Sequence, residues 1–421
     1  MRILLISYYF PPCGGAAVQR WLKWLPELVD AGFEVTVLTT EGGDHPVQDT
    51  SLLKEIPPEV RVLRSEAPSL SKFWKLLFGE KSELPHGSLD LETNASPLKK
   101  ALVWTRLNLI IPDVRKIWNP SALRHATRFL RKNPVDLVIT TGPPHSTHLV
   151  GLKLKQRHNV KWVADWRDPW SSIYYLKLNP PSKFSLNLQR RLEQKVAKSA
   201  DLNIAVSNHL ASQLPSKNTE VIYSGFQPVP VSEAEEKTSK YRIKYVGNLT
   251  EGQRFEEAVK LIKNALAGKD FELRFVGTAL SQNQRKFLAD NLPGQHSISG
   301  FLPHQQALAE IADCELLLLL INYYDGFQGM LTSKLFEYIG SGNRIFCLGP
   351  RGGEAEELIN KYGHGACFDV DETALAGAKL KSLYEAWEAG ENDKNQADNA
   401  ELSSARQAQK LIALLRGLNK C

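Results

Sequence analysis

The chain has 421 residues, of which 43% are apolar and 23% are charged, the proportions of an ordinary soluble globular protein. At roughly 100–200 residues per domain, this length predicts two or three domains. The net charge of +6 is too small to argue for a nucleic-acid partner but suits anionic substrates or an anionic membrane surface, and no apolar run reaches the ~18 residues of a membrane-spanning helix.

The chain begins with a short apolar run, Ile3–Ser7, that predicts a buried parallel strand. A secretory signal peptide is the weaker interpretation, because Pro11 and Pro12 follow almost at once. We therefore expect a cytoplasmic protein. The cysteines have neither paired nor metal-ligand spacing, which favours free thiols and predicts no metal site. They are Cys13, Cys314, Cys347, Cys367 and Cys421.

Apolar strands alternate with amphipathic helical segments through the first half of the chain. Further strands are predicted at Glu34–Leu38, Val60–Leu63, Leu137–Thr140, Lys161–Ala164, Leu202–Val206 and Val221–Tyr223. Helical patterns cover Val18–Asp30, Ser121–Arg131, Thr147–Arg157 and Leu186–Lys198. This alternation predicts an α/β domain with a doubly wound parallel sheet and helices on both faces.

Residues 65–117 interrupt this alternation, and we expect a helical insertion there. Basic and large apolar residues are interleaved in Lys72–Phe78 and again in Lys99–Trp104. A helix that lies on a membrane surface has this pattern, and a helix packed on the first domain has it too. Both interpretations stay open. Under the first, residues 70–118 make a peripheral contact with the inner face of a membrane.

A linker is predicted near residue 230, where Gln227–Thr238 combines prolines with small and charged residues. Later strands are predicted at Arg242–Val246, Glu272–Val276, Leu316–Leu320 and Ile345–Leu348. Helices are predicted at Phe255–Leu266, Ser281–Asn291, His304–Ile311, Lys334–Gly340 and Glu354–Lys361. We therefore expect two Rossmann-like domains, 1–230 and 231–400, with a helix in 401–421 that crosses back to the first. Strand carboxyl ends of both domains are expected to line a ligand cleft.

The segment Leu331–Gly342 is the most informative part of the sequence. Thr332 or Ser333 can cap a helix that follows an apolar strand. Lys334 and Glu337 are three residues apart, so they share one face of the first turns. Because a helix N-terminus favours anions, the lysine can hold a phosphate, and the carboxylate can accept hydrogen bonds from ribose hydroxyls. The segment therefore predicts a pocket for a nucleoside diphosphate.

Four motifs carry a family resemblance. They are Ser7–Gly15 with Gln19 and Arg20, Gly142–His148 with Ala164–Trp170, Tyr245–Leu249, and the helix of Lys334 and Glu337. In this order they resemble glycosyltransferase family four, of the bacterial surface-polysaccharide type, over almost the whole chain. The resemblance implies the GT-B fold, in which two Rossmann-like domains face each other across a cleft. It also implies a hexosyltransferase that retains anomeric configuration and requires neither metal nor cofactor.

In the first domain, the resemblance places Gly14 and Gly15 near the donor phosphates and the acceptor, and a tight turn is the alternative. His145 is predicted to be catalytic, by donating to a sugar hydroxyl or stabilising developing charge. Asp165, also counted among the catalytic residues, and Asp168 are predicted to position the acceptor. For both carboxylates, an ion pair with the neighbouring arginine is the alternative.

In the second domain, Asn248 and Arg254 occupy positions at which relatives commonly carry an arginine and a lysine that neutralise the diphosphate. Arg254 can still bind phosphate, together with Lys334, as the two catalytic cations. A solvated helix position is the alternative for each. Asn248 cannot supply the positive charge, and it is expected to contact substrate instead.

Glu337 matches the second of two glutamates that many relatives carry, and it would bind ribose. The first glutamate is replaced by Gly329, where no carboxylate can act. The loop before the helix is expected to hold sugar or phosphate through its backbone, and its predicted contacts are Gly329, Met330, Leu331 and Ser333. Phe301 is predicted either to stack on uracil or to pack against its own helix.

Together these features predict a retaining transferase that moves a sugar from a UDP-linked donor to a saccharide or lipid-linked acceptor in surface polysaccharide synthesis. No nucleic acid is expected as a partner. Two alternatives stay open. One is a UDP-sugar epimerase of the same fold, which needs acid and base carboxylates but no acceptor. The other is a non-catalytic nucleotide-binding relative, to which Gly329 and Asn248 point.

Overall fold

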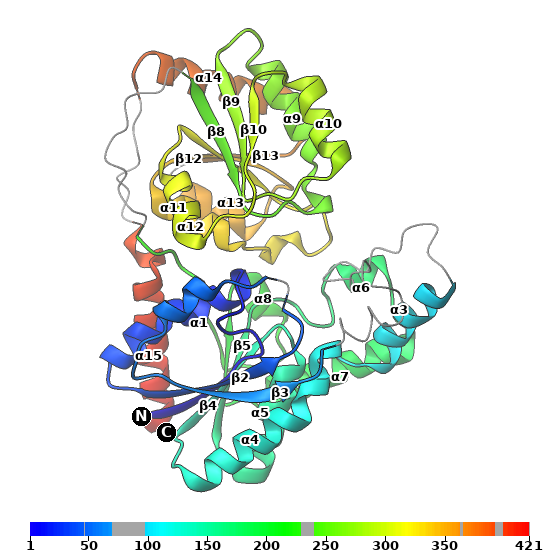
Figure 1. Ribbon diagram of the computed structural model, residues 1–421, viewed down its shortest axis with the longest axis vertical. Helices are drawn as coiled ribbons and strands as arrows, with labels where there is room; N and C mark the ends of the chain where they lie inside the picture. Colours follow the sequence, from blue (N-terminus) through cyan, green and yellow to red (C-terminus); the bar gives the residue numbers. More distant parts are fainter. Residues whose placement is uncertain (46, 70–96, 229–239, 363–364, 392–398, 421) are drawn as a thin grey trace. The chain divides into compact units, whose positions relative to one another are not determined.

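The computed structural model describes residues 1–45, 47–69, 97–228, 240–362, 365–391 and 399–420. These residues fold into two compact units, one of Met1–Tyr223 with Gln407–Cys421 and one of Ser224–Arg406. Each unit is built on a parallel sheet, with seven described strands in the first and six in the second (Figure 1). The predicted α/β class with two doubly wound sheets is therefore confirmed.

The sheet of the first unit has the order β3-β2-β1-β4-β5-β6-β7. Its strands are β1 (Arg2–Ile6), β2 (Glu34–Gly42), β3 (Arg61–Ala67), β4 (Leu137–Gly142), β5 (Lys161–Trp166), β6 (Leu202–Ala205) and β7 (Thr219–Val221). Its described helices are α1 (Ala16–Asp30), α3 (Pro97–Leu109), α4 (Asn119–Lys132), α5 (Ser146–His158), α6 (Tyr175–Leu178), α7 (Lys183–Ser199), α8 (Asn208–Gln213) and most of α15 (Ser404–Lys420), with 3-10 turns η1 (Thr50–Glu55) and η2 (Val114–Trp118).

Helices cover both faces of this sheet, which is why its central strands are continuous apolar runs. Leu25 on α1 and Leu411 on α15 belong to one buried cluster. Ala126 on α4, Leu154 on α5 and Val196 on α7 belong to the cluster under the opposite face. The C-terminal helix thus completes the core of the first unit.

The sheet of the second unit has the order β10-β9-β8-β11-β12-β13. Its strands are β8 (Tyr241–Val246), β9 (Phe271–Val276), β10 (His296–Ile298), β11 (Leu316–Leu320), β12 (Arg344–Leu348) and β13 (Gly365–Phe368). Its described helices are α9 (Phe255–Ala265), α10 (Gln282–Asn291), α11 (His304–Ala312), α12 (Ser333–Ser341), α13 (Glu354–Tyr362) and α14 (Thr373–Glu388), with 3-10 turns η3 (Glu251–Gln253), η4 (Phe327–Gly329) and η5 (Ala400–Leu402).

Helix α12 is fixed to the sheet by buried polar contacts as well as by apolar packing. The backbone N–H of Val246, at the end of β8, donates to the hydroxyl of Tyr338 on α12 at 2.9 Å. The side-chain amide of Asn343, directly after α12, donates to the carbonyl of Ile311 on α11 at 2.6 Å. These contacts hold α12 in place, and the helix carries Lys334 in its first turn and Glu337 in its second.

The predicted insertion at 65–117 is described only in part, because residues 70–96 lie outside the described residues. Its described portion contains the end of β3, helix α3 and most of η2. Along the described chain, no helix combines the length and apolarity needed to cross a membrane.

Candidate functional site

The candidate site of the second unit lies where the strand order of its sheet reverses. β8 and β11 are neighbours, but the chain continues from β8 towards β9 and from β11 towards β12. In open parallel sheets, ligands bind beyond the carboxyl ends of the strands at such a point. Residues 247–254 follow β8 here, residues 321–332 follow β11, and α12 begins directly afterwards.

Hydrogen bonds join these two loops into one rim. The hydroxyl of Thr250 donates to the side-chain oxygen of Asn322 at 2.7 Å. The backbone N–H of Tyr323 donates to the carbonyl of Gly252 at 2.9 Å. The amide of Gln253 donates to the carbonyl of Leu320 at 2.9 Å. These hydrogen bonds hold the two loops in one arrangement, and such preorganisation lowers the entropic cost of binding a ligand.

Lys334 reaches from α12 to the end of β8. Its Nζ lies 2.6 Å from the hydroxyl of Tyr245 and 3.3 Å from the carbonyl oxygen of Asn248. The nitrogen also lies 3.9 Å from the centre of the Tyr245 ring, a cation–π contact. Gly247 lies beside this nitrogen, and its backbone has φ of 101°, a conformation that favours glycine.

Burial lowers the pKa of Lys334 to about 7, although the charge of Glu337 acts in the opposite direction. Removal from water destabilises an ammonium, and an anion beside it restores the charged form. An ammonium has three N–H donors, and Tyr245 and Asn248 are acceptors for two of them. The remaining donor suits a phosphate oxygen.

The N-terminus of α12 adds backbone donors to the same place. Thr332 is the N-cap residue, but its side chain makes no capping hydrogen bond. Its Oγ1 is buried and has no hydrogen-bond partner among the described residues. The first N–H groups of a helix have no partner within the helix and attract anions. The uncapped end next to Lys334 thus offers backbone donors of the kind that attract anions.

Glu337 lies one turn further along α12, with 13% of its side chain exposed, and its Oε1 is 3.8 Å from Nε2 of His304. His304 is the first residue of α11 and follows the loop that carries Phe301, which is 65% exposed. His304 is not among the site residues predicted from the sequence. The sequence feature that could have indicated His304 is its position at the start of a helix, directly after the loop of Gly300 and Phe301.

Arg254 belongs to the same rim but does not contact Lys334 in the described structure. It has a left-handed backbone with φ of 46° and is the residue before α9. Its guanidinium lies 4.7 Å from the centre of the Tyr323 ring and 3.6 Å from Glu257. The structure thus brings Lys334 and Asn248 together and places Arg254 on the β11 side of the rim.

Gly329 lies in the 3-10 turn η4, just before α12. The turn follows Gly326, which has a left-handed backbone with φ of 91°, and the N–H of Met330 donates to the carbonyl of Phe327 at 2.9 Å. Leu331 then connects the turn to Ser333, the first residue of α12. The loop supplies backbone groups at the position where relatives carry a carboxylate.

In the first unit, the corresponding reversal lies between β1 and β4. The amide of Gly14 is already used, because it donates to the carbonyl of Val47 at 3.0 Å. Gly15 has φ of 86° and is the N-cap residue of α1. Gly14 thus pairs with the loop at Val47, and Gly15 forms the turn into α1.

Asp165 is fully buried, with 0% exposure. It accepts hydrogen bonds from Arg20 Nε at 3.2 Å, Trp21 Nε1 at 2.8 Å and Thr141 Oγ1 at 2.8 Å. Its ion-pair partner is therefore Arg20, not the neighbouring Arg167. The carboxylate joins α1 to the end of the sheet and presents no exposed oxygen to an acceptor in this structure.

His145 is held as a neutral imidazole. It is 6% exposed, and burial lowers its pKa to about 3. Its Nε2 lies 3.2 Å from the carbonyl oxygen of Pro169, and its ring is stacked on Trp170 with centroids 5.3 Å apart. A Cβ at Gly142 would lie 3.2 Å from Nδ1 of His145 and 2.7 Å from Nε2 of His148. The two histidine rings therefore leave no room for a side chain at position 142.

Asp168 differs from Asp165 because its carboxylate has no hydrogen-bond donor within reach in the described part of the chain. The side chain is partly buried, and burial raises its pKa while Arg167 lowers it. Arg167 itself donates to the carbonyls of Ala17 at 2.6 Å and Pro143 at 2.8 Å. Of the two predicted acceptor carboxylates, Asp168 is the one whose oxygens are not already engaged.

Among the residues that the structure describes, no group of three or more His, Cys, Asp or Glu side chains is placed to hold a metal ion.

A family model described as a glycosyl transferase 4-like domain matches residues 14–221. No curated protein sequence matches the chain. A glycosyltransferase from Rickettsia africae has a similar structure, with a TM-score of 0.63, 12% identity, and coverage of 99% of this chain and 98% of that one. At such low identity this similarity shows a common fold.

Two similar structures contain nucleotide. A mutant of S. aureus TarM in complex with fondaparinux, alpha-GlcNAc-glycerol and UDP has a TM-score of 0.63 and 10% identity, with 100% of both chains covered. Anabaena HepE in complex with UDP has a TM-score of 0.61 and 14% identity, with 99% of this chain and 100% of that one covered. These neighbours share the two-sheet architecture described above.

Proposed function

Because the chain belongs to the glycosyltransferases with a glycosyl transferase 4-like domain and has the GT-B fold, we propose that it transfers a hexosyl group from a UDP-sugar with retention of anomeric configuration. The acceptor is a saccharide or a lipid-linked saccharide in surface polysaccharide synthesis. The observation that carries this proposal is the half-buried ammonium of Lys334 beside the uncapped start of α12, one turn from Glu337.

In this proposal the donor extends along the rim of the second unit. Lys334 and the first N–H groups of α12 bind the diphosphate, and Glu337 accepts hydrogen bonds from the ribose hydroxyls. Phe301 stacks on the uracil. Two observations support this position for the uracil. Phe301 is exposed and lies three residues before His304, and the ring of His304 is 3.8 Å from the carboxylate of Glu337. The UDP complexes of TarM and HepE show that this fold accepts the nucleotide in those proteins.

The reaction breaks the bond between the sugar C1 and the oxygen of the β-phosphate. The acceptor oxygen bonds to C1 from the same face, and its proton passes to the departing phosphate oxygen. Negative charge develops on the β-phosphate oxygen while the C1–O bond breaks and before the proton arrives, and Lys334 and the α12 N–H groups stabilise this charge, with Arg254 as a second cation. The proposal uses these protein charges in place of a metal ion and needs no cofactor beyond the nucleotide sugar.

The first unit is assigned to the acceptor. Asp168 has the carboxylate that can orient an acceptor hydroxyl, whereas Asp165 acts indirectly, by holding Arg20 and α1. Neutral His145 and the turn at Gly14 and Gly15 shape this side of the site. The proposal also includes a cytoplasmic location and the peripheral membrane contact expected for residues 70–118, of which residues 70–96 lie outside the described residues.

A product assay with a panel of UDP-sugars tests this proposal. With an acceptor present, we expect release of UDP and a product with the anomeric configuration of the donor, resolved by proton NMR, both with and without a chelator. A stereoisomeric UDP-sugar formed without acceptor would instead identify an epimerase. UDP binding without turnover across the panel would identify a non-catalytic nucleotide-binding protein.

A further inference from the structure

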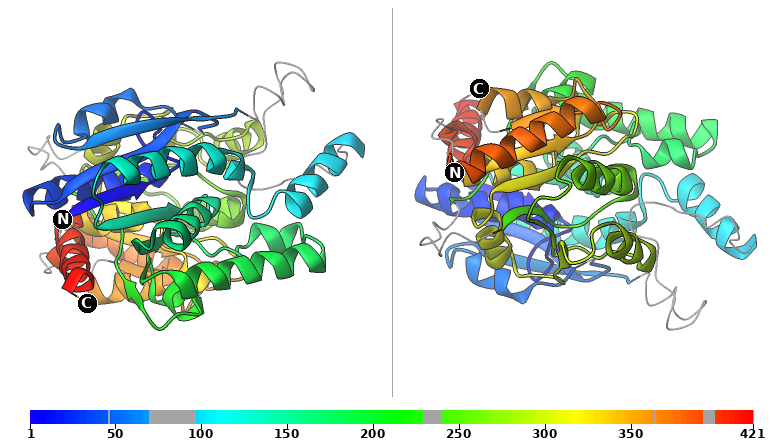
Figure 2. Two further views of the ribbon diagram at one scale, coloured as in Figure 1. Left: turned by 90° about the horizontal axis from the view of Figure 1, so that it is seen from below. Right: turned by 90° about the horizontal axis from the view of Figure 1, so that it is seen from above.

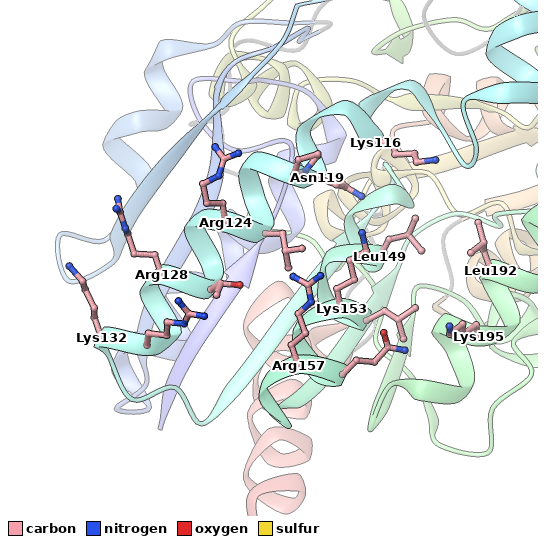
Figure 3. Close-up of a pocket in the computed structure, with 16 residues that line it drawn as sticks. Lys116, Asn119, Arg124, Arg128, Lys132, Leu149, Lys153, Arg157, Leu192 and Lys195 are labelled. Carbon is pink, nitrogen blue, oxygen red and sulfur yellow. The ribbon is translucent and has the colours of Figure 1, made fainter.

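A strongly basic groove lies on the outer side of the first unit, between α4, α5 and α7. Its volume is about 960 Å³. The lining includes Arg124, Arg128, Arg131 and Lys132 of α4 and Lys153 and Arg157 of α5. Figure 3 shows the side chains of Arg124, Arg128 and Lys132 on the side of α4 that faces away from α5. Lys116 precedes these residues, and Lys195 of α7 lies on the opposite side. The lining contains eight cations and, among the residues described, no carboxylate.

These cations are not neutralised within the unit. All eight are exposed, and in the described chain none of them lies within 4 Å of a carboxylate oxygen. The sequences of α4 and α5 contain no acidic residue at all. Like charges gathered on one surface repel one another, so the groove is arranged to receive negative charge.

An exposed apolar stripe on α7 leads into this groove. Phe184 and Leu188 are 77% and 36% exposed. Leu192 and Lys195 lie further along the same helix and line the groove. Because the spacings are four, four and three residues, the four side chains share one face of α7. The apolar stripe and the cationic groove are therefore parts of one continuous surface.

The neighbouring helix α3 carries a further exposed apolar side chain. Leu109, at the end of α3, is 65% exposed. The preceding residue, Asn108, accepts a hydrogen bond from the N–H of Ser182 at 2.7 Å and thereby fixes α3 to the start of α7. Figures 1 and 2 show α3 and α7 side by side, projecting from the sheet of the first unit. Exposed apolar side chains thus occur on both of these adjoining helices.

We propose that the α4–α5–α7 face docks onto an anionic phospholipid bilayer, with Phe184 and Leu188 entering the interface and the groove cations binding headgroup phosphates. Basic side chains flanking exposed aromatic and aliphatic ones are the surface chemistry that such a bilayer recognises. The proposed function supplies the purpose, since a lipid-linked acceptor lies in a membrane, but the docking itself is measured without sugar transfer.

The composition of the groove disfavours the other polyanions. Single-stranded nucleic acid binds through aromatic side chains on which its bases stack, and none is present among the described residues that line the groove. The floor is formed by leucines, among them Leu123, Leu149 and Leu152. A hydrated acidic glycan gains little from the exposed Phe184 and Leu188, whereas a bilayer buries both side chains.

Vesicle co-flotation of the full-length protein tests the proposal. Wild-type protein is compared on neutral phosphatidylcholine vesicles and on vesicles with about one third phosphatidylglycerol, at about 0.1 M salt, where exposed charges are only partly screened. The groove variant combines Arg128→Glu with Lys153→Glu. Its matched control combines Lys286→Glu with Lys379→Glu, which changes the net charge equally at exposed positions of the second unit.

We expect wild type and control to bind the anionic vesicles and the groove variant to bind at least tenfold more weakly. A second variant, Phe184→Ser with Leu188→Ser, should lose the part of the binding that resists added salt, whereas Leu53→Ser with Leu375→Ser should not. All four variants should bind UDP as wild type does, so failure of docking is distinguishable from failure of the proposed function.

Three results would overturn the inference. The first is a wild-type protein that ignores anionic vesicles at this salt concentration. The second is a groove variant that floats as well as its control. The third is groove-dependent binding to single-stranded RNA or to an acidic polysaccharide without vesicle binding, which would assign the surface to a different partner.

Discussion

The ammonium nitrogen of Lys334 lies 2.6 Å from the hydroxyl oxygen of Tyr245 and 3.9 Å from the centre of its ring. The tyrosine belongs to β8 and the lysine to α12, so the pair joins the two elements beside the strand reversal. Burial lowers the pKa of the lysine to about 7. A cation removed from water in this way gains most from an anionic ligand.

Replacing Lys334 with Met should weaken UDP binding by about 10–100-fold, the range for a lost charge-assisted hydrogen bond. The melting temperature should not fall, because the native state no longer has to bury an ammonium. Calorimetric titration with UDP and thermal unfolding measure the two effects. Lys286→Met, at an exposed position on α10, should bind UDP normally. Equal affinities in all three proteins would remove Lys334 from the donor site.

The affinity for UDP should fall as the pH rises above about 7.5, by up to about tenfold per pH unit, because binding must then protonate Lys334. Lys334→Arg, whose guanidinium stays charged, should not show this fall. Stability should change in the opposite direction. The native pKa of Lys334, about 7, lies below the ordinary value of 10.5. Between these two pH values the unfolded chain therefore binds more protons than the native protein. The free energy of unfolding should rise with pH across this window. Titrations in buffers of different ionisation enthalpy count the protons taken up.

Glu337→Gln should reduce the preference for ribose hydroxyls. We expect wild-type protein to bind UDP about tenfold better than 3′-deoxy-UDP, since a carboxylate is a strong acceptor. The variant should bind the two nucleotides almost equally. Competition binding with both nucleotides measures the ratio. A wild-type preference that survives unchanged in the variant would exclude Glu337 as the ribose ligand.

The two acceptor-side carboxylates should respond differently to substitution. Asp165→Asn leaves the buried charge of Arg20 uncompensated and should lower the free energy of unfolding by about 3–5 kcal/mol. Asp168→Asn should leave the free energy of unfolding unchanged or raise it. Burial raises the pKa of Asp168, so at neutral pH the native protein has to hold an ionised carboxylate in an unfavourable environment, and the amide removes this cost. It should lower transfer to acceptor without changing UDP affinity. Urea unfolding and acceptor kinetics separate these effects.

The sequence was sufficient for the two-sheet architecture because the central strands are continuous apolar runs. Leu316–Leu320 is recognisable as a strand for this reason. β10, with three half-buried residues of which one is apolar, gives no comparable pattern. Helix α14 is absent from the predicted elements although Ala376, Leu380 and Leu383 have helical spacing and are buried.

For the site, local spacing was informative and long-range pairing was not. The three-residue separation of Lys334 and Glu337 placed them on one helix. The contact between Lys334 and Tyr245 joins residues 89 positions apart, and the pairing of Asp165 with Arg20 spans 145 positions. A sequence shows which residues carry charge, but folding decides which carboxylate is buried in a network, as Asp165 is, and which keeps its oxygens available, as Asp168 does.

A crystal structure of the protein with UDP tests the central claim most directly. We predict a phosphate oxygen within about 2.7–3.2 Å of Lys334 Nζ, the hydrogen-bonding range for nitrogen and oxygen, a second phosphate oxygen at the first N–H groups of α12, and ribose hydroxyls on Glu337. A diphosphate that binds elsewhere, with Lys334 still engaged only by Tyr245 and Asn248, would contradict the account.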